Sequence, residues 1–515
     1  MNGMIRAFLP CGVAVLLAGC ASTPSGSYPP PRLAQSPKTG WDWHFRDFVI
    51  GAWWGPGFSE AEVKVYKEAG FNVVMCGRYM AMDSYGNPIQ AMKELDLAQE
   101  YNLGVMFDTY TMNDKPWGGT AGEVDGHPTH HAASLTELKW LYRRFGGHPA
   151  LAGFMIGDDK SALTQRLIDC TDFLRREAPG LMPWICQNVP NPESLAEHGN
   201  PIFDTQIYPT LYSWEMSADE HARHYARAYA TQREQSRRLD LLFWPMFNIA
   251  SWGEGLNGFK CIPTDSLTRF PAYAALAYGA QGIMYFTYNG GALQNPGPHA
   301  DEAAVRQALS PLYPVVKTQN RRIAAWGPDL IGSDSIGLFG TAWPADTGSA
   351  ESLTPPAPGK LVETMDEKLM AGVLVKQGKK PMLMVVDTRT SKAFGDLAPR
   401  RVTLKLSAAV KAIDVLSVVA GIQQPRRVKG SVLTLTLAAG EGQLVVLHGR
   451  ALARLATSDA IISGPVADRT ASGAGEHRAQ TRVNPRVSPR GANWALAAEE
   501  LPAATPIMDH GVLDF

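Results

Sequence analysis

Two adjacent carboxylates mark the most informative segment of the chain. Residues 151–159 read LAGFMIGDD, an apolar run of strand length that ends in Asp158 and Asp159. Charge placed against a buried strand is costly unless it faces a wet cleft. Two carboxylates in unlike environments can divide the roles of acid and of base or nucleophile. The pair therefore predicts acid–base chemistry at this strand end, and a helix-capping role for at least one of the two aspartates stays open.

The segments around this pair alternate between apolar runs and patterns of helical period. The expected strands cover residues 48–54, 71–78, 103–110, 151–159, 182–189, 203–210, 241–250 and 282–290. The expected helices cover residues 59–70, 87–102, 134–146, 161–180, 217–240, 266–281 and 301–323. Near-continuous apolar strands between helices are typical of a parallel sheet buried on both faces. Eight such units predict an α/β fold, a closed (β/α)8 TIM barrel, over residues 41–328.

The pattern changes after about residue 328. Short, partly alternating strands are expected at residues 372–377, 381–389, 401–406, 412–417, 431–437 and 442–449. Turns rich in Gly, Lys and Pro separate them, which predicts a C-terminal antiparallel β-sandwich over residues 329–450. The remaining segment, residues 451–515, is rich in Ala, Gly, Arg and Pro and is predicted to be disordered.

The N-terminus predicts export and anchoring rather than fold. Residues 1–19 form a signal peptide with an apolar run that is too short to span a bilayer. The LAGC sequence that ends at Cys20 resembles the bacterial lipoprotein box, which implies cleavage before Cys20 and lipid on its thiol. Ala21 in place of Asp implies the outer membrane, on its periplasmic or surface face. Residues 20–40 are predicted to be a stalk, and an ordinary signal peptide with an incidental cysteine stays open.

Composition argues against several classes of partner. The formal net charge is −1, so neither nucleic acid nor an anionic membrane surface is expected as a partner beyond the lipid anchor. No glycine-rich phosphate motif follows a strand, and no CxxC or paired metal-ligand spacing occurs. We therefore expect no cofactor and no metal. The cysteines left after the leader and the lipid site are expected to be buried free thiols: Cys76, Cys170, Cys186 and Cys261.

The carboxyl ends of barrel strands are where a TIM barrel keeps its site. The strand ends of this chain carry aromatic, amide and carboxylate side chains. The residues expected to bind the substrate are Trp54, Arg78, Asp108, Tyr110, Asp158, Asn188, Gln206, Tyr208, Asn248, Trp252 and Tyr288. Aromatic faces stack on the C–H faces of sugar rings, and amides and carboxylates bind hydroxyls. This pattern predicts a carbohydrate site.

Several motifs carry a resemblance to a known group of enzymes. They are GAWWGP at 51–56, HPALAGFMIGDDKS at 148–161, AYAALAYGAQGIMYFTYN at 272–289 and AAGEGQLVVL at 438–447. The run of residues 48–290 resembles the clan A glycoside hydrolases, in particular bacterial barrels of the family 42-like type. The resemblance implies hydrolysis of O-glycosidic bonds in an oligo- or polysaccharide by a pair of carboxylates. It places the family's strand-four acid at Asp159.

The chain departs from the family's pattern in two ways. Asp159 stands where the family has Glu, and the seventh strand ends in Asn248 where the family has a nucleophilic Glu. We predict Asp159 as the general acid, with either Asp204 on the sixth strand or Glu254 on a later loop as the second carboxylate. A structural role for Asp204 stays open. So does the alternative that the barrel binds carbohydrate without catalysis, and a purely structural envelope lipoprotein is a third reading.

Overall fold

A computed structural model describes most of the chain between residues 40 and 452. The described residues are 40–75, 88–108, 135–158, 163–209, 215–249, 263–289, 293–294, 301–343, 353–449 and 452. The predicted signal peptide, the lipid site at Cys20 and nearly all of the predicted stalk and tail lie outside these residues. None of the described helices is long and apolar enough to cross a bilayer.

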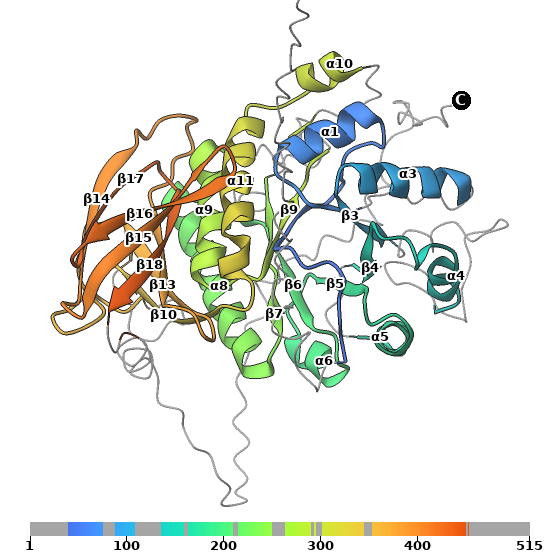
Figure 1. Cartoon of the computed structure of the whole chain (residues 1–515), viewed down its shortest axis with the longest axis horizontal. Coiled ribbons are helices and arrows are strands. Elements are labelled where there is room, and N and C mark those ends of the chain that lie inside the picture. Colours follow the sequence, from blue (N-terminus) through green and yellow to red (C-terminus); the bar gives the residue numbers. More distant parts are fainter. Residues whose placement is uncertain are drawn as a thin grey trace, which may run out of the picture. The chain divides into compact units, whose positions relative to one another are not determined.

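The first sheet closes on itself as a parallel barrel (Figure 1). Its strands are β1 (Val49–Ala52), β2 (Val73–Met75), β3 (Gly104–Asp108), β4 (Leu151–Gly157), β5 (Met182–Gln187), β6 (Ile202–Ile207), β7 (Leu242–Phe243), β8 (Met246–Asn248) and β9 (Gly282–Phe286). The order is β5-β4-β3-β2-β1-β9-β8-β6-β7, and β5 also pairs with β6, which closes the ring. The short strands β7 and β8 are halves of one strand, interrupted where Pro245 lacks a backbone N–H. The predicted eight-stranded TIM barrel is confirmed.

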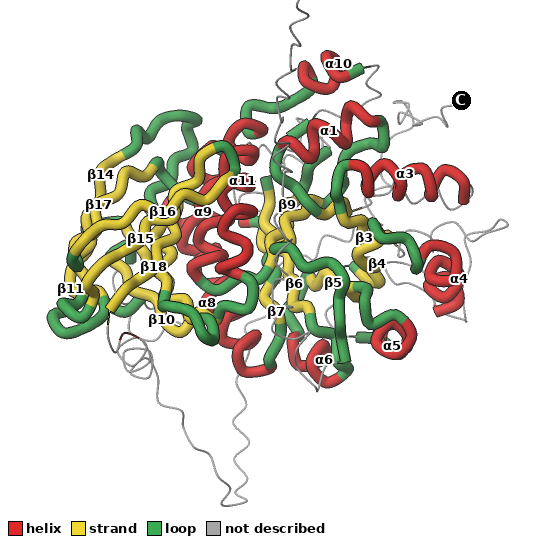
Figure 2. Tube along the Cα trace, viewed as in Figure 1, coloured by secondary structure: helices red, strands yellow, loops and turns green. Residues whose placement is uncertain are grey.

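Helices surround the barrel, as Figure 2 shows in red around the yellow strands. They are α1 (Glu60–Glu68), α3 (Pro88–Glu100), α4 (Leu135–Phe145), α5 (Gln165–Glu177), α6 (Pro192–Glu197), α8 (Ala218–Leu239), α9 (Asp265–Ala277), α10 (Glu302–Gln307) and α11 (Tyr313–Leu330). The short helix α6 was not predicted. The single helix predicted over 301–323 was wrong: it is two helices, α10 and α11, with Pro311 between them and Pro314 in the first turn of α11.

The helix that follows the two aspartates begins later than expected. Its first residue is Gln165, and its N-cap is Thr164, whose backbone is extended. Asp158 therefore does not cap this helix, and Asp159 lies outside the described residues. Asp158 lies six residues before the cap and is buried, so its carboxyl needs another explanation.

The N-terminal segment closes the amino end of the barrel. Trp43 is buried and packs against Trp244, with ring centroids 6.1 Å apart. The ring of His44 contacts the carbonyl oxygen of Leu151 at the start of β4, 2.7 Å away. A Cβ on Gly282, at the start of β9, would lie 2.9 Å from the Trp244 ring, so glycine is required for this packing. Trp43 and Trp244 at this end of the barrel are therefore part of the apolar core.

Two antiparallel sheets follow the barrel and confirm the predicted β-sandwich. The strands are β10 (Asp334–Gly340), β11 (Val362–Met365), β12 (Leu369–Val375), β13 (Met382–Asp387), β14 (Arg400–Leu406), β15 (Val410–Val419), β16 (Ile422–Lys429), β17 (Val432–Leu437) and β18 (Gly442–Gly449). One sheet has the order β10-β12-β13-β18-β15-β16 and the other β11-β14-β17. Side chains such as Leu383, Val385, Val402 and Leu404 form the core of the sandwich.

Three strands of the sandwich were not predicted: β10, β11 and β16. The sequence of β16 is IQQPRRVK, and most of its side chains are exposed. Among the described strands it lies at the edge of its sheet, paired with β15. Proline and charge are typical of edge strands because they discourage further pairing. The same residues remove the apolar alternation from which a strand is predicted.

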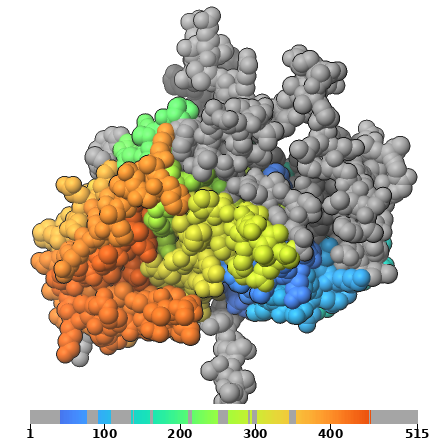
Figure 3. All heavy atoms as spheres, turned by 90° about the horizontal axis from the view of Figure 1, so that it is seen from above, coloured from blue at the N-terminus to red at the C-terminus, as the bar shows by residue number. Residues whose placement is uncertain are grey.

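The barrel and the sandwich pack together through helices α9 and α11. In Figure 3 the orange surface of the sandwich adjoins the yellow-green surface of the segment that precedes it in the chain. Nearly every side chain of α9 is buried. A Cβ on Gly372 of β12 would lie 2.1 Å from the carbonyl oxygen of Ala277, so the strand approaches the helix as closely as glycine allows. The guanidinium of Arg322 on α11 lies 5.0 Å from the ring centre of Trp326 and donates to Gln443 of β18 over 2.8 Å. Arg322 also forms an ion pair with Glu441.

We expect Arg322→Ala to lower the free energy of unfolding by about 2–4 kcal/mol, because it removes a stacked cation and leaves Glu441 partly buried without its cation. Urea denaturation of the full chain measures this. The neighbouring Arg321 is exposed, so Arg321→Ala should change stability by no more than about 0.5 kcal/mol. Equal effects of the two substitutions would contradict a stabilising role for the Arg322 contacts.

Candidate functional site

The contacts of β6 show which of its side chains face the barrel interior and which face the surrounding helices. The Thr205 hydroxyl accepts a hydrogen bond from Gln232 on α8, so Thr205 faces the helices. Side chains alternate along a strand, and therefore Asp204 and Gln206 face the barrel interior. Gln206 is the higher of the two, toward the carboxyl end, where the site is expected.

A row of aromatic rings lies at the carboxyl end of the barrel. The Phe286 ring at the end of β9 lies 5.9 Å from Trp54 after β1, and it stacks on Tyr208 after β6 with centroids 4.7 Å apart. Trp54 and Phe286 are partly exposed, whereas Tyr208 is buried and its hydroxyl contacts the Met246 sulfur over 2.8 Å. Rings from three strands thus form one apolar surface at the site.

Asp158 lies at the same end of the barrel, directly after β4. The residue is 8% exposed, and Gln206 Nε2 donates to its Oδ1 over 3.5 Å. This contact joins β4 to β6 at the carboxyl end of the barrel. A carboxylate held by an amide, at the end of the barrel that also carries the aromatic rings, is suited to bind sugar hydroxyls.

Asp204 lies deeper and is fully buried. Burial raises the pKa of its carboxyl well above the usual range, and the charge of Asp158 raises it further. The Trp184 indole, the Cys186 thiol and the Met246 backbone N–H face the carboxyl and lower its pKa. Even so, neither carboxyl oxygen has a hydrogen bond of ordinary geometry. Burial without such hydrogen bonds therefore favours the neutral form of this carboxyl.

Tryptophan rings make the wall beside this carboxyl apolar. Trp53 is buried and meets Trp184 edge to face, with centroids 5.7 Å apart. Trp53 and Trp54 therefore point to different surroundings, one into the core and one to the barrel mouth. Cys186 is buried and free, as is Cys170; the other two expected thiols, Cys76 and Cys261, lie outside the described residues.

The structure places several predicted substrate contacts away from the mouth. Tyr288 is fully buried, and its ring packs on Tyr66 at 4.8 Å and on Phe71 at 5.8 Å. It is a core residue in this structure, which corrects the expectation that it contacts substrate. Asn248 is buried and accepts a hydrogen bond from Tyr225 on α8 over 3.1 Å. That contact ties Asn248 to the helical layer.

Other predicted site residues are exposed or cannot be placed. Asn188, just beyond the end of β5, is exposed. Asp108 is the last residue of β3, and only its backbone is described. The predicted site residues outside the described part of the chain are Arg78, Tyr110, Asp159, Trp252 and Glu254. Their roles stay predictions.

The sequence analysis did not identify Phe286 or Trp184 as parts of the site. Tyr285 donates to Asn320 on α11 over 2.6 Å, so it faces the helices. Alternation along β9 then directs Phe286 inward. The same alternation along β5 brings Trp184 and Cys186 to one face. The alternation of side chains along each strand could have identified these residues from the sequence. To use it, one must first know for one residue of each strand whether its side chain faces the barrel interior or the helices.

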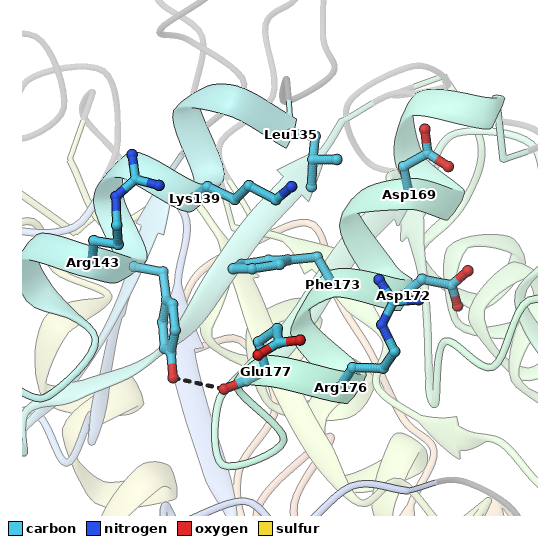
Figure 4. A pocket seen from close by; sticks show the side chains of 9 residues that line it. Leu135, Lys139, Arg143, Asp169, Asp172, Phe173, Arg176 and Glu177 are labelled. Atoms are coloured by element: carbon cyan, nitrogen blue, oxygen red, sulfur yellow. Dashed lines mark hydrogen bonds between the residues drawn. The ribbon is translucent and has the colours of Figure 1, made fainter.

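A pocket of about 460 Å³ lies on the outer surface between α4 and α5 (Figure 4). Phe173 stands at its centre, with Lys139 5.7 Å from the ring and Tyr142 edge-on at 5.6 Å. The Tyr142 hydroxyl donates to the Glu177 carbonyl over 2.6 Å. Charges of both signs line the pocket, and it lies behind the barrel wall rather than at the strand ends. We assign it to the solvated junction of two helices.

Comparison with known proteins gives similarity of fold only. No protein-family model matches the chain, and no curated protein matches it. A family 5 glycoside hydrolase from Bacteroides vulgatus is 13% identical, with a TM-score of 0.47, over 82% of this chain and 96% of that one. A GH42 beta-galactosidase from G. stearothermophilus, solved as a catalytic mutant, is 9% identical, with a TM-score of 0.45, over 79% and 99%.

A beta-galactosidase from the psychrophilic Marinomonas ef1 is 13% identical, with a TM-score of 0.37. The match covers 55% of this chain and 60% of that enzyme, less than two thirds of its length. At such identities and TM-scores, none of these similarities identifies the activity of this chain.

Among the described residues, no group of three His, Cys, Asp or Glu side chains is placed to hold a metal ion.

The raised pKa of Asp204 predicts how stability depends on pH. Between the ordinary pKa and the raised one, folded Asp204 keeps a proton that the unfolded chain has released. The free energy of unfolding therefore falls as the pH rises through this window, by up to about 1.4 kcal/mol per pH unit. Asp204→Asn removes this loss, so the variant should gain stability relative to the wild type from about pH 4 toward neutral.

Urea denaturation at a series of pH values measures this difference. The matched control is Asp169→Asn on the exposed side of α5, which should follow the wild type at every pH. If the wild type and Asp204→Asn differ by the same amount throughout, Asp204 is not a buried acid with a raised pKa.

Proposed function

We propose that this protein is a glycoside hydrolase that cleaves O-glycosidic bonds of an oligo- or polysaccharide. The supporting observation is that the carboxyl end of the barrel carries both the row of Trp54, Phe286 and Tyr208 rings and the Asp158–Gln206 pair. A sugar ring would stack on the aromatic surface, and its hydroxyls would bind the carboxylate and the amide.

The chemistry needs one acid and one base or nucleophile. The acid protonates the leaving glycosidic oxygen, while water or a carboxylate attacks the anomeric carbon. Asp159 is the proposed acid, because it follows Asp158 at the end of β4 and matches the family's acid position. Asp204 does not contact substrate, since no part of it is exposed. Of the two candidates for the second carboxylate, Glu254 therefore remains.

A second candidate function is carbohydrate binding without catalysis. It is favoured by the end of β8, where Asn248 stands in place of a carboxylate and is held by Tyr225. Such a barrel would keep the aromatic surface and lose hydrolysis. The two functions predict different results in the same experiment.

The test uses the full chain in detergent with a panel of aryl glycosides and polysaccharides. Hydrolysis should fall at least about 100-fold in Asp159→Asn and in Glu254→Gln, because each removes a reacting carboxylate. Asp169→Asn, on the outer surface, is the control and should keep full activity. Saccharide binding that weakens in Trp54→Ala, without hydrolysis in any form of the protein, would establish the second function instead.

We also propose that Cys20 carries lipid and anchors the protein in the outer membrane of the bacterial envelope. The LAGC sequence and the Pro- and Ser-rich stretch after it support this. Two or three acyl chains bind a membrane durably, whereas one chain binds reversibly. Cys20→Ala should therefore abolish labelling by palmitate and release the protein from the membrane fraction. A labelled or membrane-bound Cys20→Ala protein would contradict the anchor.

A further inference from the structure

Asp158 follows β4 and Asp204 belongs to β6, and a single strand of the barrel, β5, lies between these two strands. Gly157 of β4 pairs with Ile185 of β5, and Cys186 of β5 pairs with Asp204 of β6. Continuing the first register by one residue places Asp158, Cys186 and Asp204 in one row. Two strand spacings separate the two aspartate backbones, roughly 9–10 Å. Gln206, two residues beyond Asp204, donates to Asp158 and links the two strands.

The two carboxyls have unequal surroundings. Asp158 retains a small exposed area and an amide donor, whereas Asp204 has no exposed area and no hydrogen bond of ordinary geometry to either oxygen. The Trp53 and Trp184 rings make the barrel wall there apolar. A charge is far less costly at Asp158 than at Asp204, and two charges in this space repel each other.

We propose that Asp204 is a positioning residue that keeps its proton while Asp158 is ionised, so that the pair carries a single negative charge, on Asp158. The titratable groups of the described residues that face Asp204 are Asp158, directly after β4, and Cys186 from β5. From β8 it is faced by the backbone N–H of Met246. This role rests on the proposed function only in its consequence, which is that the charge lies at the end of the barrel where the sugar would bind.

The retained proton distinguishes Asp204 from a nucleophile. A nucleophile must be ionised and must reach the anomeric carbon, and Asp204 does neither. Asparagine resembles the protonated acid in shape and neutrality, so Asp204→Asn should preserve the charge on Asp158. Alanine leaves a void and removes every polar contact at this position.

Infrared spectroscopy of the full chain tests the proton directly and needs no substrate. At neutral pH the wild type should show the carbonyl band of a protonated carboxyl, and this band should be missing in Asp204→Asn but present in Asp169→Asn. Absence of the band from the wild type, or its persistence in Asp204→Asn, would overturn the proposal. The result does not depend on whether the protein hydrolyses any glycoside.

The coupling of the two groups is tested with Asp158→Asn. Removing the charge on Asp158 should let Asp204 ionise more easily, so the band should disappear at a pH about one unit lower than in the wild type. This arm requires no substitution of the buried residue and therefore stands if Asp204→Asn fails to fold. An unchanged titration would show that the charge on Asp158 does not act on Asp204, and would contradict the proposal.

The last measurement is hydrolysis or binding of a saccharide. With any saccharide that is cleaved or bound, Asp204→Asn should retain activity or affinity within about threefold at neutral pH, while Asp204→Ala loses tenfold or more. A loss of a thousandfold or more in well-folded Asp204→Asn would make Asp204 a reacting group and refute the positioning role. Failure to cleave or bind any saccharide would refute the proposed function and leave the infrared result intact.

Discussion

The closure of β5 onto β6 is the constraint on which the rest of the molecule depends. A parallel sheet leaves hydrogen-bonding edges until it becomes a ring, and the ring makes every strand central. It also fixes the register of each strand against two neighbours. Because β4, β5 and β6 are held in this way, Asp158, Cys186 and Asp204 form a row without any direct contact being needed to align them.

Closure also gives the barrel an amino end and a carboxyl end that differ in the side chains they carry. The amino end is packed with buried side chains, among them Trp43 and Trp244. The carboxyl end carries the Trp54, Phe286 and Tyr208 rings and the Asp158–Gln206 pair. The depth of a side chain in the ring then decides its chemistry. Asp158 at the rim can bear charge, and the deeper Asp204 cannot without a large cost.

The sandwich packs directly against the helices of the barrel. Helix α9 is buried on nearly all sides, and Gly372 brings β12 against its last turn. Arg322 of α11 donates to Gln443 of β18 and forms an ion pair with Glu441 just before that strand, and its guanidinium also lies over the ring of Tyr273 on α9. Contacts of this kind hold the outer helices in place, and the helices in turn hold the strands whose ends form the site.

Much of the architecture could be predicted from the sequence, because periodicity is local. The eight apolar runs, most of the helices and six of the sandwich strands follow from residue spacing alone. The exceptions have physical reasons. Pro311 divides one helical pattern into two helices, and the polar edge strand β16 lacks the alternation of a half-buried strand. The candidate residues at the strand ends could also be named, since position along a barrel strand follows from chain order.

The tertiary structure alone decided which of these residues act together. Tyr288 and Phe286 are two residues apart, yet one packs beneath α1 and the other lines the mouth. Asp204 and Asp158 are similar acids in the sequence, and their difference comes from the burial that neighbouring strands impose. Residue type and spacing are properties of a local segment. Depth, register and charge repulsion depend on segments far apart in the chain, which meet only when the barrel closes.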